Sequence, residues 1–350
     1  MAHELAFGDD GAARMMYVEE VPWHGLGKRL NSPPTAEEAI KAAGLDWTVA
    51  RAPLFYHESV EQTGVVRGHY AIVPTEGWTK RERPVFGVVT EQYQPLQNVE
   101  AFSFFDPLID GGQATYETAG ALGEGERVWV LTKLAGDGIR VGRGGEDAVG
   151  RYLLLSNSHD GRSAVQVKFT PIRVVCNNTL TLALKRGPCL KVEHTREMKR
   201  RLELAKQLLV EIIDGYAEIE QAFKRFATTP LGDKELHAYL DAVFPPPTPP
   251  ASPKKESAAR YEAECERAKR HRGCCMELFG TWRNRLPGTA GTLWAAYNSV
   301  TEYVDHYYVA GNSRALSPSG RLQSMWFGRG SLTKAVAFSK AREIIESRRN

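Results

Sequence analysis

The chain has 350 residues, of which 42% are hydrophobic and 25% are charged, and its formal net charge is +3 at pH 7. This composition is typical of a globular protein with a buried core, and it excludes a chain that is disordered throughout. No apolar run approaches the ~20 residues that a membrane-spanning helix needs. The stretch from Met1 to Asp10 is too acidic and polar for a secretory signal, so we expect a cytoplasmic protein of two or three domains.

The N-terminal segment is predicted to be irregular up to a first short helix. Residues 1–27 are rich in glycine, and we expect an arm or loop there. Thr35, followed by Glu38 three residues later, forms the capping-box pattern. This pattern predicts a helix over 36–43 that ends at Gly44.

Strand signals dominate the rest of the first half. Runs rich in β-branched and aromatic residues predict strands over 47–56, 69–73, 84–89, 113–121, 127–134 and 152–157. A helix is expected among them over 98–109, where four apolar side chains share one helical face, namely Val99, Phe102, Phe105 and Ile109. Asp160-Gly161, between two apolar runs, predicts a two-residue hairpin turn.

The second half has a helical period. Apolar residues at three- and four-residue steps predict helices over 194–227, 232–243, 256–279, 289–308 and 331–347. Six prolines between 245 and 253 predict an extended linker.

The fold class is therefore α+β: an antiparallel sheet with flanking helices in the N-terminal half, followed by an all-helical C-terminal region. The predicted domains are an α+β domain (1–190), a helical extension (191–244), the linker (245–253) and a C-terminal helical region (254–350).

Positive charge is concentrated in the middle of the chain. Between 156 and 206, eleven basic residues stand against four acidic ones, a net charge of +7 where the whole chain carries +3. Such a concentration is typical of a nucleic-acid contact, because cations that neutralise phosphates release condensed counterions. The alternative is a solvated helix face. The basic residues are Arg162, Lys168, Arg173, Lys185, Arg186, Lys191, Arg196, Lys199, Arg200, Arg201 and Lys206.

Within this stretch, Pro171 ends a strand, and Thr170 is positioned to cap a helix that opens near Ile172. Arg173, Asn177 and Asn178 would then lie at a helix N-terminus, whose free N–H groups attract phosphate. Alternatively, the two asparagines bind backbone groups in a turn. Aromatic residues near basic ones would stack on unpaired bases or lie in the core, and these are Trp78, Trp129, Tyr152 and Phe169.

Sequence patterns of catalysis are weak. The glycine-rich run over 136–150 lacks the phosphate-loop motif and is typical of a hairpin tip, with contact to nucleic acid through its arginines as the alternative. The adjacency of Ser158, His159 and Asp160 does not indicate a triad, because triad residues converge from separate elements. Glu302 and Asp305 lie one helical turn apart, but the sequence brings no third carboxylate to them. We predict no catalytic residues.

Metal and disulfide chemistry are not indicated either. The five cysteines are odd in number and irregularly spaced, which favours reduced thiols over a disulfide framework. His271, close to three of them, does not complete the paired spacing of a structural zinc site. We therefore predict neither a metal nor a cofactor. The cysteines are Cys176, Cys189, Cys265, Cys274 and Cys275.

Several motifs carry a resemblance to a known family. They are Pro22-Trp23-His24-Gly25-Leu26-Gly27, Ser158-His159-Asp160-Gly161, Phe169-Thr170-Pro171, Arg173-Val174-Val175-Cys176-Asn177-Asn178-Thr179-Leu180, Thr292-Leu293-Trp294 and Val300-Thr301-Glu302-Tyr303-Val304-Asp305-His306. In this order they resemble the phage- and plasmid-associated domain of unknown function 932. The resemblance implies a mobile-element protein in a bacterial host cell and supplies no catalytic residues. The order of elements is also similar in outline to Rad52-like single-strand annealing proteins, an analogy of fold that does not determine function.

These observations predict a DNA-binding protein of a mobile element, a homo-oligomer that holds single-stranded DNA in a basic groove and assists recombination, annealing or replication. The alternatives are a metal-dependent nucleic-acid hydrolase and a structural or interaction protein that binds no nucleic acid. The predicted DNA-binding residues are Arg162, Lys168, Arg173, Asn177, Asn178, Lys185, Arg186, Lys199, Arg200 and Arg201.

Overall fold

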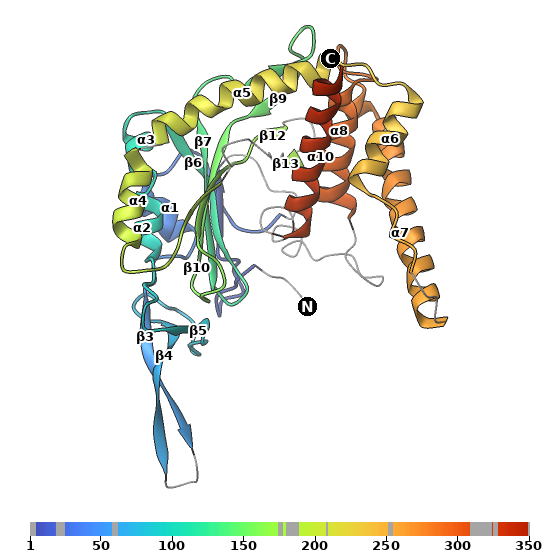
Figure 1. Cartoon of the computed structure of the whole chain (residues 1–350). Coiled ribbons are helices and arrows are strands. Elements are labelled where there is room, and N and C mark those ends of the chain that lie inside the picture. The colour runs from blue at the N-terminus through green and yellow to red at the C-terminus, as the bar shows by residue number, and fades with distance from the viewer. Residues whose placement is uncertain are drawn as a thin grey trace.

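The computed structural model describes residues 5–18, 25–57, 62–173, 178–179, 189–207, 209–250, 255–308, 324 and 328–348. Its fold confirms the predicted class, since antiparallel strands form the N-terminal half and helices form the C-terminal half (Figure 1). The long helix α5 (Leu209–Thr228) runs along one end of the main sheet and connects the two halves (Figure 1).

The main sheet has seven strands in the order β14-β11-β10-β7-β6-β1-β2. All neighbours are antiparallel except β1 and β2, which are parallel. The strands are β1 (Met15–Val18), β2 (Lys28–Leu30), β6 (Ala114–Leu122), β7 (Arg127–Leu134), β10 (Tyr152–Ser158), β11 (Val165–Phe169) and β14 (Cys189–Val192). The prediction of an irregular arm over 1–27 was wrong for β1, whose four side chains are buried in this sheet.

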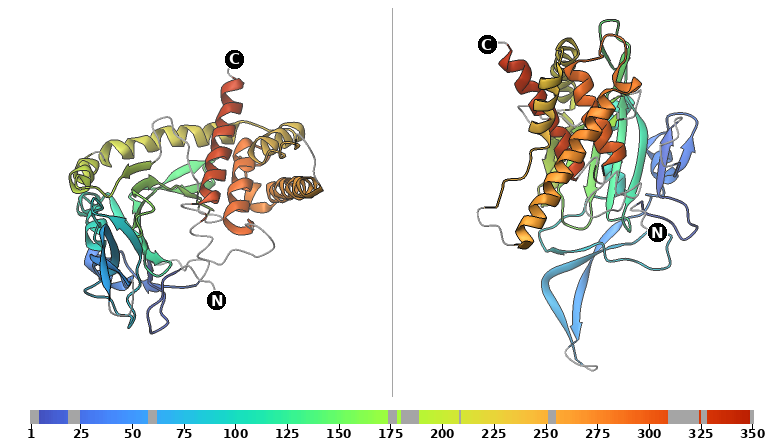
Figure 2. Two further views of the ribbon diagram at one scale, coloured as in Figure 1. Left: turned by 60° about the horizontal axis from the view of Figure 1, so that its bottom comes forward. Right: turned by 90° about the vertical axis from the view of Figure 1, so that its right-hand side faces the viewer.

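A three-stranded sheet in the order β3-β4-β5 projects from the body of the molecule (Figures 1 and 2). It contains β3 (Val49–His57), β4 (Thr63–Pro74) and β5 (Gly87–Thr90). The register of β3 and β4 shifts between Pro53 and Leu54. Beyond this shift the two strands pair only with each other, because β5 pairs with β4 from His69 to Ile72.

A small four-stranded sheet has the order β13-β12-β9-β8. Its strands are β8 (Ile139–Val141), β9 (Asp147–Gly150), β12 (Ile172–Arg173) and β13 (Asn178–Thr179). The strands β8 and β9 form the hairpin that the glycine-rich run predicted. The prediction of a helix that opens near Ile172 was wrong. Ile172 and Arg173 form a strand that pairs with Gly150 and Val149, so no free helix N-terminus lies there.

The helix α1 (Ala36–Ala42) confirms the capping box, since the Thr35 side chain accepts from Glu38 N and the Glu38 carboxylate accepts from Thr35 N. The single helix predicted over 98–109 is instead two, α2 (Asn98–Ser103) and α3 (Asp106–Asp110). Pro107 lies in the first turn of α3, where its missing N–H favours a helix start over a helix interior. Val99 is 60% exposed, so it does not belong to the predicted apolar face.

The C-terminal helices confirm the predicted helical patterns, with some divided. They are α4 (Met198–Gln207), α5, α6 (Asp233–Val243), α7 (Lys255–Phe279), the 3-10 turn η1 (Trp282–Asn284), α8 (Leu293–Glu302), the π-helical turn η2 (Tyr303–Tyr307) and α10 (Arg329–Ser347). The helix α8 is buried along its whole length and contacts α5, α7 and α10 (Figure 2). Residues 245–250 have no regular secondary structure, as the proline run predicted.

One hydrophobic cluster contains residues of both halves, from Ala6 to Ala341. Its aromatic centre brings Phe223 of α5 to within 4.7 Å of Trp294 of α8, measured between ring centroids. Trp294 Nε1 in turn donates to Asp147 Oδ2 of β9 at 2.8 Å. This buried hydrogen bond joins the helical half to the small sheet. The three boundaries between the four predicted segments remain predictions.

Candidate nucleic-acid interface

The structure distributes the ten predicted DNA-binding residues over several elements. Arg162 is exposed in the β10–β11 turn, and Lys168 is half-buried on β11. The backbones of Arg173 and Asn178 belong to the small four-stranded sheet, whereas β14 is an edge strand of the main sheet. Three residues belong to the exposed surface of α4, namely Lys199, Arg200 and Arg201. Asn177, Lys185 and Arg186 lie outside the described residues.

The helix α4 spreads its three consecutive cations around its axis. Its buried face is formed by Met198, Leu202 and Ala205. Consecutive residues are about 100° apart on a helix, so Lys199, Arg200 and Arg201 cannot share one face. Lys199 Nζ lies 2.5 Å from Glu100 Oε1 of α2, and Arg200 Nε lies 2.7 Å from Glu197 Oε2. Two of the three cations are therefore already paired, although exposed ion pairs such as these are weak.

A second group of cations gathers where β11 begins and β14 ends. Val165 pairs with Val192 in antiparallel register, so the residues before β11 lie beside those after β14. This register places Arg162, Lys191 and Arg196 at the same end of the two strands, and we call these three residues the basic sheet end. All three side chains are exposed, and no ion pair links them to a carboxylate in the part of the chain that the structure describes.

Three carboxylates lie close to the basic sheet end along the chain. Glu197 is bound to Arg200, Glu193 is exposed on the same stretch, and Asp160 accepts from Arg162 N in the β10–β11 turn. The sequence prediction counted Lys191 and Arg196 in the charge run without assigning them to the interface. Sequence reasoning did not assign these two residues because their position depends on the register between β11 and β14, which local sequence patterns do not show.

A buried polar cluster lies beneath the basic sheet end and holds its backbone in place. Tyr93 Oη donates to Ser158 O at 2.8 Å, and the Tyr93 ring stacks on His194 with centroids 4.6 Å apart. Asp160 Oδ1 accepts from Arg162 N at 2.8 Å, which fixes the turn that carries the arginine. Burial, which the positive field of His194 supplements, lowers the pKa of His159 to about 3.

The same cluster explains the Ser158-His159-Asp160 motif. His159 is fully buried, and its Nε2 lies 3.1 Å from Asn98 Oδ1. Asn98 Nδ2 donates to two backbone carbonyls, so its Oδ1 accepts and His159 Nε2 carries the proton. The hydroxyl of Ser158 donates to Asp160. The histidine therefore bonds to α2 and not to the serine, and the motif shapes a turn.

The candidate carboxylates for a metal site are held by other side chains. Glu302 accepts from Arg283 Nη1 at 3.1 Å and from Asn284 Nδ2 at 2.8 Å. Asp305 Oδ1 lies 2.7 Å from Lys334 Nζ. Within the described ranges, no group of three or more His, Cys, Asp and Glu side chains is arranged to hold a metal ion.

The cysteine-rich part of α7 is also accounted for by packing. His271 Nδ1 lies 2.6 Å from Tyr303 Oη, and its ring stacks on Tyr308. Burial, with the positive charges of two neighbouring arginines, lowers the pKa of His271 to about 4. Three cysteines of this helix are free thiols, and they are Cys265, Cys274 and Cys275.

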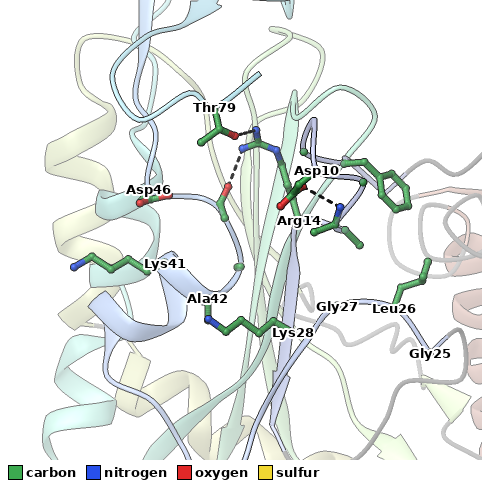
Figure 3. Close-up of a pocket in the computed structure, with 17 residues that line it drawn as sticks. Asp10, Arg14, Gly25, Leu26, Gly27, Lys28, Lys41, Ala42, Asp46 and Thr79 are labelled. Atoms are coloured by element: carbon green, nitrogen blue, oxygen red, sulfur yellow. Dashed lines mark hydrogen bonds between the residues drawn. The ribbon is translucent and has the colours of Figure 1, made fainter. Parts of the chain in front are cut away.

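The N-terminal segment forms a pocket of about 680 Å³ around Arg14 (Figure 3). The buried guanidinium of Arg14 donates to Gly44 O at 2.9 Å and to Thr79 Oγ1 at 3.1 Å, and it lies 4.3 Å from the ring centroid of Trp78. Burial lowers the pKa of Arg14. Two lysines and two aspartates also line the pocket, so its charge is nearly balanced and favours no ligand class. Arg14 anchors the segment that precedes β1 to α1 and to the loop before β5.

The aromatic residues considered for base stacking are mostly internal. Trp129 is fully buried and Phe169 is 8% exposed, which places both in the core. Trp78 and Tyr152 are half-buried. Exposed aromatic side chains lie elsewhere. Trp282 of η1 and Tyr307 of η2 are 67% and 49% exposed, and on the described strands Phe55 and Tyr56 of β3 are 56% and 48% exposed. Sequence reasoning missed Phe55 and Tyr56 because an alternating strand does not show by itself whether either face is covered.

Comparison with known proteins identifies a family. Residues 85–326 match the family model described as Domain of unknown function (DUF932). No curated protein and no solved structure matches the chain. The matched range contains the basic sheet end and most of the C-terminal helices, while the Arg14 pocket and the strands β1 to β4 precede it. None of the helices in the described ranges is both long and apolar enough to span a bilayer.

Proposed function

Since the chain belongs to the DUF932 family, whose description assigns no activity, we propose a function from its charges: it binds nucleic acid through phosphate contacts at the basic sheet end. The preferred ligand is single-stranded DNA, and the protein binds it as a homo-oligomer. The protein belongs to a phage or a plasmid. In this setting it assists recombination, annealing or replication.

One observation carries the proposal. Arg162, Lys191 and Arg196 are exposed together at one end of the main sheet, without ion-pair partners among the described residues. Each phosphate that a cation neutralises releases condensed counterions, and a cation without a carboxylate partner can bind a phosphate without first breaking an ion pair. Because hydrogen bonds fix the turn at Arg162, the backbone of this surface is already ordered before a strand binds.

The proposed surface is narrower than the groove predicted from the charge run. Arg201 of α4 is a further candidate for this surface, because it is exposed and has no ion-pair partner in the described ranges. Lys199 and Arg200 would first have to exchange their carboxylate partners for phosphate. Lys168 and Arg173 lie on β11 and β12, and their part in binding stays a prediction, as it does for Asn177, Asn178, Lys185 and Arg186.

The test is the salt dependence of binding to a labelled single-stranded oligonucleotide. Each phosphate contact on a single strand contributes about −0.7 to the slope of log affinity against log salt. The triple variant R162E/K191E/R196E should therefore flatten the slope by about 2, since three contacts are lost. The matched control R267E/K269E/R270E changes the net charge equally on the exposed surface of α7 and should keep the wild-type slope.

Two outcomes would contradict the proposal. Wild-type protein that does not bind the oligonucleotide at low salt would remove its basis. Equal loss of binding in the two triple variants would show that net charge alone is responsible. The same oligonucleotide, incubated with Mg²⁺ or Mn²⁺, tests the hydrolase alternative, which requires that the strand be cut.

A further inference from the structure

The distal part of the β3–β4 hairpin projects from the body with little support. We call it the arm and define it as Leu54–His57 and Thr63–Val66, the residues beyond the register shift. Its cross-strand pairs are Leu54–Val66, Phe55–Val65, Tyr56–Gly64 and His57–Thr63. Figure 1 and the right-hand view of Figure 2 show this hairpin extending away from the other sheets and the helices. An isolated two-stranded hairpin is marginally stable in water, so its apolar side chains are not explained by a core of its own.

The arm presents one large aromatic ring on each face. Phe55 is 56% exposed and Tyr56 is 48% exposed, and neighbouring residues of a strand point to opposite faces. The Tyr56 ring lies over Gly64, where a Cβ atom would be only 2.4 Å from the ring. Val65, opposite Phe55, is itself 53% exposed. Each ring therefore has one partner across the hairpin and a free surface toward solvent.

The formal charges of the hairpin are balanced between its two strands and their connection. The described residues of β3 and β4 include Arg51 and Arg67 and contain no aspartate or glutamate. Arg67 is exposed within the register shift, at the root of the arm. Two glutamates, Glu58 and Glu61, belong to the connection between the strands, which lies outside the described residues.

The arm is rooted next to the basic sheet end. Arg51 Nη1 donates to Glu91 O at 2.8 Å, in the segment that continues to Tyr93, and Tyr93 stacks on His194. His194 precedes Arg196 by two residues. On the other side, β5 packs against the Arg162 turn, since a Cβ on Gly87 would lie 2.4 Å from Asp160 O. A strand bound at the basic sheet end would therefore pass the base of the arm.

We infer that the arm binds unpaired bases, with Phe55 and Tyr56 stacking on the bases of the strand whose phosphates the basic sheet end holds. This inference rests on the proposed function. A protein partner fits less well, because a stable protein interface buries about 800 Å² on each side, and the arm divides its few apolar residues between two faces. Stacking needs only one exposed ring per base, and any base provides a face.

The experiment compares two labelled probes of equal length and equal phosphate number, a single-stranded deoxyoligonucleotide and the same backbone without bases. Wild-type protein should bind the probe with bases more tightly, by about 5- to 140-fold for each stacked base. The variant F55L/Y56L should lose this preference while its affinity for the abasic probe and its salt slope stay at wild-type values. The matched control L332A changes an apolar residue of α10 that is 69% exposed, and it should keep the preference.

The outcomes separate the inference from the proposed function. If wild-type protein binds neither probe, the proposed function fails and the inference fails with it. If it binds both probes equally, or if F55L/Y56L keeps the preference, only the inference is overturned. If F55L/Y56L instead sediments as a smaller species with an unchanged preference, the arm is a self-association surface, and the inference is again overturned.

Discussion

Lys334 Nζ lies 2.7 Å from Asp305 Oδ1, and both side chains are completely buried where α10 packs against the π-helical turn η2. Burial lowers the pKa of Lys334, and the negative charge of Asp305 partly offsets this effect. Asp305 belongs to the motif Val300-Thr301-Glu302-Tyr303-Val304-Asp305-His306. In that motif, Glu302 and Asp305 bind cationic side chains of other elements, so they hold the helical half together.

Removing one partner of this pair should destabilise the protein strongly. We expect K334M to lower the free energy of unfolding by about 3–5 kcal/mol, because Asp305 would lose its buried cationic partner. The double variant K334M/D305L should be more stable than K334M, since it removes both charges. Urea unfolding measures all three proteins. K340M, which removes an exposed pair with Glu343 on the same helix, should change stability by less than about 0.5 kcal/mol; a similar loss in K340M and K334M would refute this account.

The stability of the protein should fall in mild acid because of His159. Burial holds the pKa of His159 at about 3 in the folded chain, whereas an unfolded histidine titrates near its ordinary value of about 6.5. Below that ordinary value the unfolded chain binds a proton that the folded chain does not. Each pH unit between these limits should therefore cost about 1.4 kcal/mol of unfolding free energy. H159Q keeps a donor for Asn98 and removes the titration, so its unfolding free energy should depend less steeply on pH.

Urea unfolding of wild-type protein and H159Q at about pH 7, 6 and 5 measures this difference. His194 and His271 also have lowered pKa values and are present in both proteins, so the comparison isolates His159. Parallel pH profiles of the two proteins would show that His159 does not contribute.

The contact between β5 and the Arg162 turn should be sensitive to a single methyl group. A Cβ on Gly87 would lie 2.4 Å from Asp160 O and 2.7 Å from Asp160 Cα, and backbone atoms of a hydrogen-bonded turn cannot easily move away. We expect G87A to lose about 1–3 kcal/mol of stability. G273A is the matched control, because no atom lies within 4 Å of its new Cβ in α7, and it should gain up to about 1 kcal/mol. Thermal unfolding compares them, and equal midpoints would show that the turn yields to the methyl group.

Local patterns were enough to predict many elements. The Thr35 and Glu38 capping box predicted α1, and the strand expected over 127–134 is β7 without a shift at either end. The helical periods of the second half predicted α6, α7 and α10. These features depend on interactions between residues a few positions apart, or on the alternation of apolar residues along one element. A single sequence contains both kinds of information.

Other elements depended on distant partners. The strand β1 has only four residues, and its place between β2 and β6 comes from pairing with segments up to 105 residues away, as between Met15 and Gly120. Ile172 and Arg173 follow a proline that suits a helix start, but pairing with β9 makes them a strand. In both cases, hydrogen bonds to a neighbouring strand outweighed the local preference.

The charge of the candidate site was determined by the sequence alone, since the excess of cations over 156–206 is a matter of composition. Tertiary structure decided which of these cations share a surface. The antiparallel register of β11 and β14 places Arg162 and Arg196 at the same end of these strands, and the turn of α4 separates Lys199 from Arg201. Exposure of Phe55 and Tyr56 was likewise decided by the fold, because a strand's alternation specifies two faces and only the surrounding elements determine whether either face is covered.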